Sequence, residues 1–250
     1  MDRELLREAV LRALDAVIDP ELDEPITDLG FIHTVDVTPA GDLEVHLRLP
    51  TSFCAPNFAY LMASDAKDVL VALDWTRRVV VELDDHHDSD IINTGLATDA
   101  GYRGTFAHEA EENLDELRTT FQRKAHTAAM ERCLTGLLRA GHPAESLASV
   151  TLAELPDDDA ARALRRRRAA LGLSAAADSL VLVDHDGQPP TDPELALRRA
   201  RSTRISIDGN AHFCRGLLRT RYVDGGSESL SIATSQRAMP LELTVVGRNA

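Results

Sequence analysis

A cysteine stands where an alternating strand pattern gives way to a helical one, in the stretch LRLPTSFCAPNFAYL. Pro56 is a natural first-turn residue, and it predicts that a helix begins just after Cys54. The free amides and positive dipole at a helix N-terminus favour a thiolate, which is both a nucleophile and a metal ligand. Cys54 is therefore either a reactive or metal-binding thiol, or a small apolar side chain buried at the tight junction between strand and helix.

Further candidate metal ligands follow the predicted strand RRVVVEL. His86 and His87 come first, with Asp88 and Asp90 behind them. Imidazole and carboxylate groups suit iron or zinc, so His86 and His87 are candidate ligands. Adjacent side chains on an extended chain point to opposite sides, which favours the simpler alternative of a solvated polar loop.

The other two cysteines carry weaker signals. Cys133 lies near the apolar stripe of a predicted helix and is interpreted as a packing residue. Cys214 follows His212 by two residues, and on a strand the two would share a face, as a metal half-site or a thiol–imidazole pair requires. No other ligand or orienting acid has a recognisable spacing, so packing is the favoured interpretation of Cys214 as well.

The residues around Cys54 predict a small two-layer α+β domain. Apolar residues from Leu6 to Val17 recur at helical spacing, and Pro20 ends that helix. Alternation on both sides of the turn TPAGD predicts a β-hairpin, which the helix after Cys54 and the strand RRVVVEL follow. The expected element order is α-β-β-α-β, in a domain spanning residues 1–105.

The remaining chain is expected to form two further parts. Residues 106–173 should be helical, with one long helix over 107–140 and another after Pro156. Residues 174–250 should form a small β-rich domain for partner docking, because SLVLVDHDGQPP, TRISIDGN, ESLSIAT and LELTVVG alternate like short strands. The predicted fold class is therefore α+β, with a helical middle segment and a β-rich C-terminal domain.

Composition narrows the classes of partner and compartment. The formal net charge of −14 disfavours nucleic-acid binding, since phosphate neutralisation supplies most of that affinity. No apolar run approaches the roughly 20 residues that a membrane-spanning helix needs, and the charged start MDRELLREAV does not read as a secretory signal. Three scattered cysteines argue against a disulfide framework. We therefore expect a cytoplasmic protein with no membrane or nucleic-acid partner.

Three short motifs fall in order on the expected elements: DPEL at residues 19–22, DLG at 28–30 and TSFC at 51–54. With them, the first third of the chain resembles the PaaD/SufT-type iron–sulfur cluster assembly domain family. The resemblance implies the fold order given above and a transiently bound iron ion or iron–sulfur cluster. The cofactor-binding residues that it implies are Asp19, Glu21, Leu22, Thr51 and Cys54.

The chemistry of these groups limits what the resemblance implies. Two carboxylates near Cys54 would by themselves disfavour its thiolate, but a bound cation reverses that effect. One thiolate cannot hold a cluster that needs four ligands, so the site is expected to be transient or shared with a client or a second copy in a homodimer. The expected function is a non-catalytic assembly or maturation factor for a client metalloenzyme, with a multicomponent oxygenase as the client that the resemblance suggests.

Two other functions remain open from the residues. The chain could be a structural accessory subunit or chaperone of an oxygenase, with no metal handling. It could also be an enzyme with Cys54 as nucleophile, which requires a general base within hydrogen-bond reach. Only His33 and His46 lie early enough in the sequence to be candidates for that base.

Overall fold

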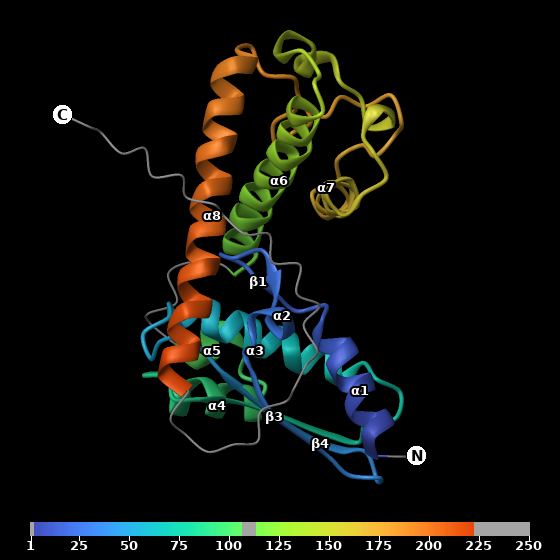
Figure 1. The fold of residues 1–250 in the computed structure, drawn as a ribbon. Coiled ribbons are helices and arrows are strands. Elements are labelled where there is room, and N and C mark those ends of the chain that lie inside the picture. The colour runs from blue at the N-terminus through green and yellow to red at the C-terminus, as the bar shows by residue number, and fades with distance from the viewer. Residues whose placement is uncertain (1–2, 107–113, 223–250) are drawn as a thin grey trace, which may run out of the picture.

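The computed structural model describes residues 3–106 and 114–222, and its N-terminal part is a small α+β domain (Figure 1). The order of elements contains the predicted α-β-β-α-β series, with a short strand pair and one helical turn inserted after the first helix and two helices added after the last strand. The elements are α1 (Arg3–Leu14), β1 (Ile18–Asp19), β2 (Glu24–Pro25), α2 (Ile26–Leu29), β3 (Ile32–Val37), β4 (Asp42–Arg48), α3 (Pro56–Val71), β5 (Arg78–Asp84), α4 (Ser89–Ala97) and α5 (Gly101–Phe106).

The main sheet has the strand order β3-β4-β5. The hairpin strands β3 and β4 are antiparallel, whereas β4 and β5 are parallel, with Arg48 opposite Asp84 at the last pair. Parallel neighbours need a crossover connection, and α3 supplies it. Because β4 and β5 end at the same edge of the sheet, the loop with Cys54 and the loop with His86 leave that edge together.

One core fills the space between this sheet and its helices. The predicted alternation holds in β4, where Leu43, Val45 and Leu47 are buried. Helix α1 buries Leu6 and its partners at helical spacing, and both α1 and α3 pack beside the sheet. The two-layer arrangement predicted from the periodicities is therefore confirmed.

The second part of the molecule is helical. It contains α6 (Leu114–Arg139), the 3-10 turns η2 (Ala144–Ser149) and η3 (Leu152–Glu154), α7 (Asp159–Ala170) and α8 (Pro193–Tyr222). Helix α6 packs against both α7 and α8, around a second core cluster that includes Leu134, Leu164 and Val181. The long helix expected in the middle segment is confirmed over residues 114–139, and the helix after Pro156 begins at Asp159, with Asp158 as its N-cap.

The expectation of a β-rich C-terminal domain needs correction. The run TRISIDGN, predicted as a strand, lies inside the 30-residue helix α8. The run SLVLVDHDGQPP contributes only an isolated bridge between Thr151 and Leu180. The alternating Ile205 and Ile207 misled the prediction, because the helical spacing of the buried residues Ala200, Ile207, Ala211 and Leu218 decides the structure. The runs ESLSIAT and LELTVVG lie outside the described residues.

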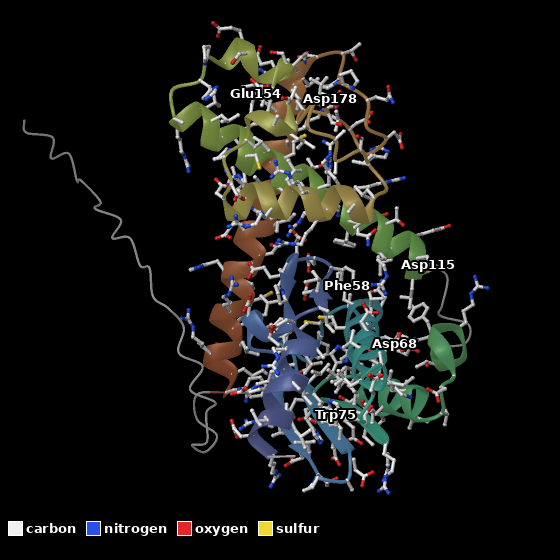
Figure 2. The ribbon with its side chains drawn as sticks, turned by 90° about the vertical axis from the view of Figure 1, so that its right-hand side faces the viewer. Phe58, Asp68, Trp75, Asp115, Glu154 and Asp178 are labelled. Atoms are coloured by element: carbon white, nitrogen blue, oxygen red, sulfur yellow. The ribbon has the colours of Figure 1, made fainter. Side chains whose placement is uncertain are left out.

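Helix α8 joins the two cores. Its Ala200 belongs to the helical cluster, whereas Ala211 and Leu218 are buried in the core of the N-terminal domain. Figure 1 shows the helix running from the far end of the helical part down along the N-terminal domain. A second contact between the parts is the edge-to-face packing of Phe58 on α3 against Phe121 on α6, with ring centroids 4.9 Å apart. Figure 2 places Phe58 at the end of α3 nearest the helical part and Trp75 near the other end.

The contact between α8 and the DLG motif yields a stability prediction. Gly30 caps α2 in the left-handed conformation, with φ of 78°, and a Cβ added there would lie 3.3 Å from Leu218 Cδ2. A non-glycine residue in that conformation costs roughly 1–2 kcal/mol, and the flexible Leu218 side chain can give way. We expect Gly30→Ala to lower the free energy of unfolding by that amount, measured by denaturant titration with Trp75 fluorescence. Gly216→Ala is the control, since its Cβ would meet no atom within 4 Å; equal stability of the two variants would contradict the prediction.

Candidate functional site

Cys54 lies in the loop that connects β4 to α3. Ala55 is the N-cap of α3 and Pro56 its first residue, so Cys54 directly precedes the helix cap, as predicted. The cysteine side chain is half-buried, and its Sγ lies 3.6 Å from Thr51 Oγ1. Thr51 also accepts a hydrogen bond from the Phe53 amide at 3.3 Å, which folds the TSFC segment into a tight turn. The sequence-predicted pair Thr51 and Cys54 is thus brought together.

His86 reaches the Cys54 loop from the neighbouring end of β5. Its Nε2 lies 2.8 Å from the Cys54 carbonyl oxygen, and its Nδ1 accepts a hydrogen bond from the Asp88 amide at 3.1 Å. Because the Asp88 amide can only donate, the proton of a neutral His86 ring belongs on Nε2. The ring is only 8% exposed, and both of its nitrogens have partners, so metal ligation by His86 would require it to release one of them.

The backbone of His87 links the same two loops. Its amide donates to the Ser52 carbonyl at 2.9 Å, and its ring lies against the exposed Phe53 ring, with centroids 5.8 Å apart. The two histidines therefore hold the position of the TSFC segment. Their role as metal ligands stays a prediction.

The DPEL motif forms the tight turn between β1 and β2. Asp19 Oδ1 accepts hydrogen bonds from the amides of Glu21 and Leu22, at 2.9 and 2.8 Å. Asp19 is only 6% exposed, and this burial raises its pKa to about 6, although the two amides act in the opposite direction. Leu22 is 2% exposed and packs in the core, so it contributes to the turn by anchoring it.

Helix α8 lies over both motifs. Asn210 Nδ2 donates to Glu21 Oε1 at 3.2 Å, and Arg215 pairs with Glu24 in the strand that follows the turn. Farther along the helix, Arg221 donates to the Leu49 carbonyl and to Ser52 Oγ, both at 3.0 Å. The C-terminal half of α8 therefore spans the distance from the DPEL turn to the Cys54 loop.

Cys214 lies on α8 between these two groups of contacts. It is half-buried and packs against the same core cluster as Cys54. The pKa of Cys214 is raised to about 11, chiefly by burial and to a smaller extent by the nearby Cys54, Asp19 and Glu21. The DPEL and TSFC motifs thus place Asp19, Glu21 and Cys54 within electrostatic range of Cys214 on the C-terminal helix.

No sequence motif placed Cys214 at this site. The expected strand would have paired it with His212, but in a helix residues two apart point about 200° away from each other. His212 is exposed, whereas Cys214 faces the domain. The helical spacing of Ala211, Cys214 and Leu218 was the available signal.

Cys133 is 6% exposed in the helical core, and burial raises its pKa to about 11, as a packing role predicts. Within residues 3–106 and 114–222, no three His, Cys, Asp or Glu side chains converge closely enough to hold a metal ion.

The two histidines considered as bases for Cys54 belong to a different cluster. The carboxylate of Asp84 is hydrogen-bonded to His33 Nδ1 and to His46 Nδ1, each at 2.8 Å. The other ring nitrogen of His46, Nε2, lies 3.0 Å from Glu44 Oε1. Burial opposes protonation of His46, but the hydrogen bonds to Asp84 and Glu44 outweigh it and raise its pKa. In the part of the chain that the structure describes, the hydrogen-bond partner of Cys54 Sγ is Thr51, and no imidazole is hydrogen-bonded to the sulfur.

A cavity of about 630 Å³ lies on another side of the DPEL turn, between the two parts of the molecule. Its charged lining residues are largely paired, Arg118 with Asp65 at 2.8 Å and Arg167 with Asp23 at 2.6 Å. These pairs tie the helical part to the N-terminal domain around the cavity. None of the helices in the described ranges is both long enough and apolar enough to cross a membrane.

Comparisons with known proteins point to the same part of the chain. The family model described as "Iron-sulfur cluster assembly protein" matches residues 7–83. An iron–sulfur cluster carrier protein of Mycobacterium leprae is 45% identical over 49 residues, which are 20% of this chain and 13% of the relative. An uncharacterized protein of Methanocaldococcus jannaschii is 32% identical over 90 residues, which are 36% of this chain and 93% of that protein.

A solved structure, a domain of unknown function from Bacillus anthracis, covers 40% of this chain and 96% of its own, with 22% identity and a TM-score of 0.31. The chain spans only 13% of the length of the mycobacterial carrier protein that it matches. The archaeal relative, in contrast, is matched over almost its whole length. Through this N-terminal domain, the chain belongs to the iron–sulfur cluster assembly protein family.

Proposed function

We propose that this protein is a non-catalytic assembly factor that transiently carries iron, or an iron–sulfur cluster, to a client metalloenzyme. The observation that carries the proposal is the half-buried Cys54 thiol, held before the N-terminus of α3 within the domain that defines the family. Thiolate is a ligand that iron and iron–sulfur clusters accept readily.

The surroundings of Cys54 suit a carrier better than a storage site. A carrier must bind the metal or cluster and then release it, and a site in which the protein supplies only some of the ligands permits this release. The buried carboxylate of Asp19 supplies negative charge near Cys214, and a bound cation would compensate the charges of the carboxylate and of a thiolate. The remaining coordination positions would belong to sulfide, to the client or to a second copy of this chain.

The absence of an imidazole at the sulfur, among the hydrogen bonds of the described residues, supports a non-catalytic role over a cysteine nucleophile. His86 donates to the Cys54 carbonyl and so fixes the loop without reaching the thiol. The family resemblance favours a multicomponent oxygenase as the client, and the three scattered cysteines favour the reducing cytoplasm as the compartment. The helical part lies outside the domain that is shared with the relatives, and it would provide the surface that binds this client.

An anaerobic titration with ferrous iron tests this proposal. We expect Cys54→Ala to weaken iron binding at least ~10-fold in competition with a chromogenic chelator, because it removes a direct ligand. Cys133→Ala is the matched control, since it removes a thiol buried in the other core. Equal iron affinity of wild type and Cys54→Ala would overturn the proposal. If a client co-expressed with Cys54→Ala also reached full activity, the protein would instead be a structural accessory subunit.

A further inference from the structure

The face of α8 that contacts the N-terminal domain carries a cysteine at its centre. Ala211 and Leu218 are buried in the domain core, at 2% and 8% exposure, and Cys214 lies between them at helical spacing. The same helix face is fixed at both ends, by Asn210 on Glu21 and by Arg221 on the Cys54 loop. These contacts determine the rotation of α8, and they point Cys214 toward the two motifs.

Both ends of the contact are built from residues of the candidate site. Glu21 belongs to the DPEL motif, and Ser52, which accepts from Arg221 at 3.0 Å, stands two residues before Cys54. Arg221 also donates to the carbonyl of Asp85, in the loop that carries His86. The helix thus holds the DPEL turn and both loops from the sheet edge in a single arrangement.

We propose that Cys214 is the second thiolate of the site, so that Cys54 and Cys214 together form a two-cysteine half-site for a thiophilic metal ion. The inference rests on the proposed function and deepens it, because it assigns a ligand from the C-terminal helix to cargo held by the assembly domain. Two thiolates leave two of the four positions of a tetrahedral ion, or of an iron in a cluster, for sulfide or for client ligands.

The binding step is an exchange of protons for metal. Each thiol releases one proton to solvent as its sulfur forms a bond to the divalent ion, so one ion displaces two protons and no electron is transferred. The carboxylates of Asp19 and Glu21 lie near Cys214, and the positive charge of a bound ion would compensate their negative charge together with that of the thiolates. The half-site would therefore assemble around the ion.

Cobalt(II) is the probe for this proposal, because each bound thiolate adds sulfur-to-metal charge-transfer absorption in the near ultraviolet. The full-length protein is titrated anaerobically after reduction, as wild type, Cys54→Ala, Cys214→Ala, the double variant and Cys133→Ala. We expect either single variant to lose about half of the charge-transfer intensity and ~10-fold or more in affinity. The double variant should lose the absorption, and Cys133→Ala should behave as wild type.

The outcomes separate this inference from the proposed function. Loss with Cys54→Ala but not with Cys214→Ala would overturn the two-thiol site and leave Cys54 as a ligand. No loss with either variant would overturn both proposals. Loss with Cys214→Ala alone would overturn the pairing and the role given to Cys54.

A second measurement needs no substitution, and so it does not depend on the folding of Cys214→Ala. A short bifunctional alkylating reagent that becomes fluorescent only after both of its arms react is added to the metal-free wild-type protein. We expect peptide mapping to find Cys54 joined to Cys214, and prior loading with ferrous iron to slow the reaction. Alkylation of the two cysteines without cross-linking would contradict the proposed pair.

Discussion

Gly41→Ala is expected to lower the free energy of unfolding of the N-terminal domain by about 3 kcal/mol or more. Gly41 closes the turn between β3 and β4 with φ of 89°, where an L side chain costs roughly 1–2 kcal/mol. A Cβ there would also overlap the Trp75 carbonyl oxygen and lie 3.3 Å from the Arg77 nitrogen. Both neighbours are backbone atoms, which cannot rotate away as Leu218 can at Gly30.

The single tryptophan of the chain reports on this region directly. Trp75 packs against the N-terminal core, so its fluorescence during a urea titration follows the domain that contains Gly41. Gly216→Ala is the control, because Gly216 lies in the part of α8 that packs against the same core. Its Cβ would meet no atom within 4 Å, and alanine there should stabilise the helix by ~0.5–1 kcal/mol. A loss below about 1 kcal/mol for Gly41→Ala would contradict the prediction.

The Gly41 turn matters to the site because it sets the start of the parallel pair. The Arg77 amide donates to the Gly41 carbonyl at 2.8 Å, and the Arg77 side chain pairs with Asp42 at 2.7 Å. Asp42 stands opposite Arg78 at the first pair, and the register continues unbroken to Arg48 and Asp84. A displaced turn would shift the edge from which the Cys54 and His86 loops emerge.

Local signals predicted the position of Cys54 well. Alternation in β4, a proline at the first turn and helical spacing beyond it each act over a few residues, and all three agree on a helix that begins after Cys54. The meeting of the His86 loop with the Cys54 loop follows from the parallel β4–β5 pair. The direction of the His86 ring does not, because the Asp88 amide and the Cys54 carbonyl determine it in three dimensions.

The contribution of α8 could not be predicted in the same way. Asn210 and Glu21 are 189 residues apart, and no local pattern connects them. The alternation around Ile205 and Ile207 competed with a helical spacing that extends over 30 residues, and a short window favoured the strand. A strand there would place Cys214 on one face with His212, whereas the helix places Cys214 between Ala211 and Leu218, on the face that contacts the N-terminal domain.

Asp19→Asn is expected to stabilise the metal-free protein at neutral pH. Burial raises the pKa of Asp19 from an ordinary value of 3.8 to about 6, so above pH 6 the folded protein holds a buried negative charge. At 1.36 kcal/mol for each pKa unit, that charge costs about 3 kcal/mol. Asparagine keeps the oxygen that accepts from the amides of Glu21 and Leu22 but carries no charge. We therefore expect a gain of up to about 3 kcal/mol for Asp19→Asn at pH 7.5.

The pH dependence identifies the cause of that gain. Between pH 6 and 3.8 the folded wild type binds a proton at Asp19 that the unfolded chain does not, so its stability rises as the pH falls through 6. The advantage of Asp19→Asn should therefore shrink toward pH 4, in urea titrations that follow Trp75 with a chelator present. Asp42→Asn should have the opposite effect and lower the stability of the protein at neutral pH. The reason is that the hydrogen bonds from Arg77 lower the pKa of Asp42 and so favour its charged form in the folded state. An advantage of Asp19→Asn that did not change with pH would mean that packing, and not the buried charge, had been altered.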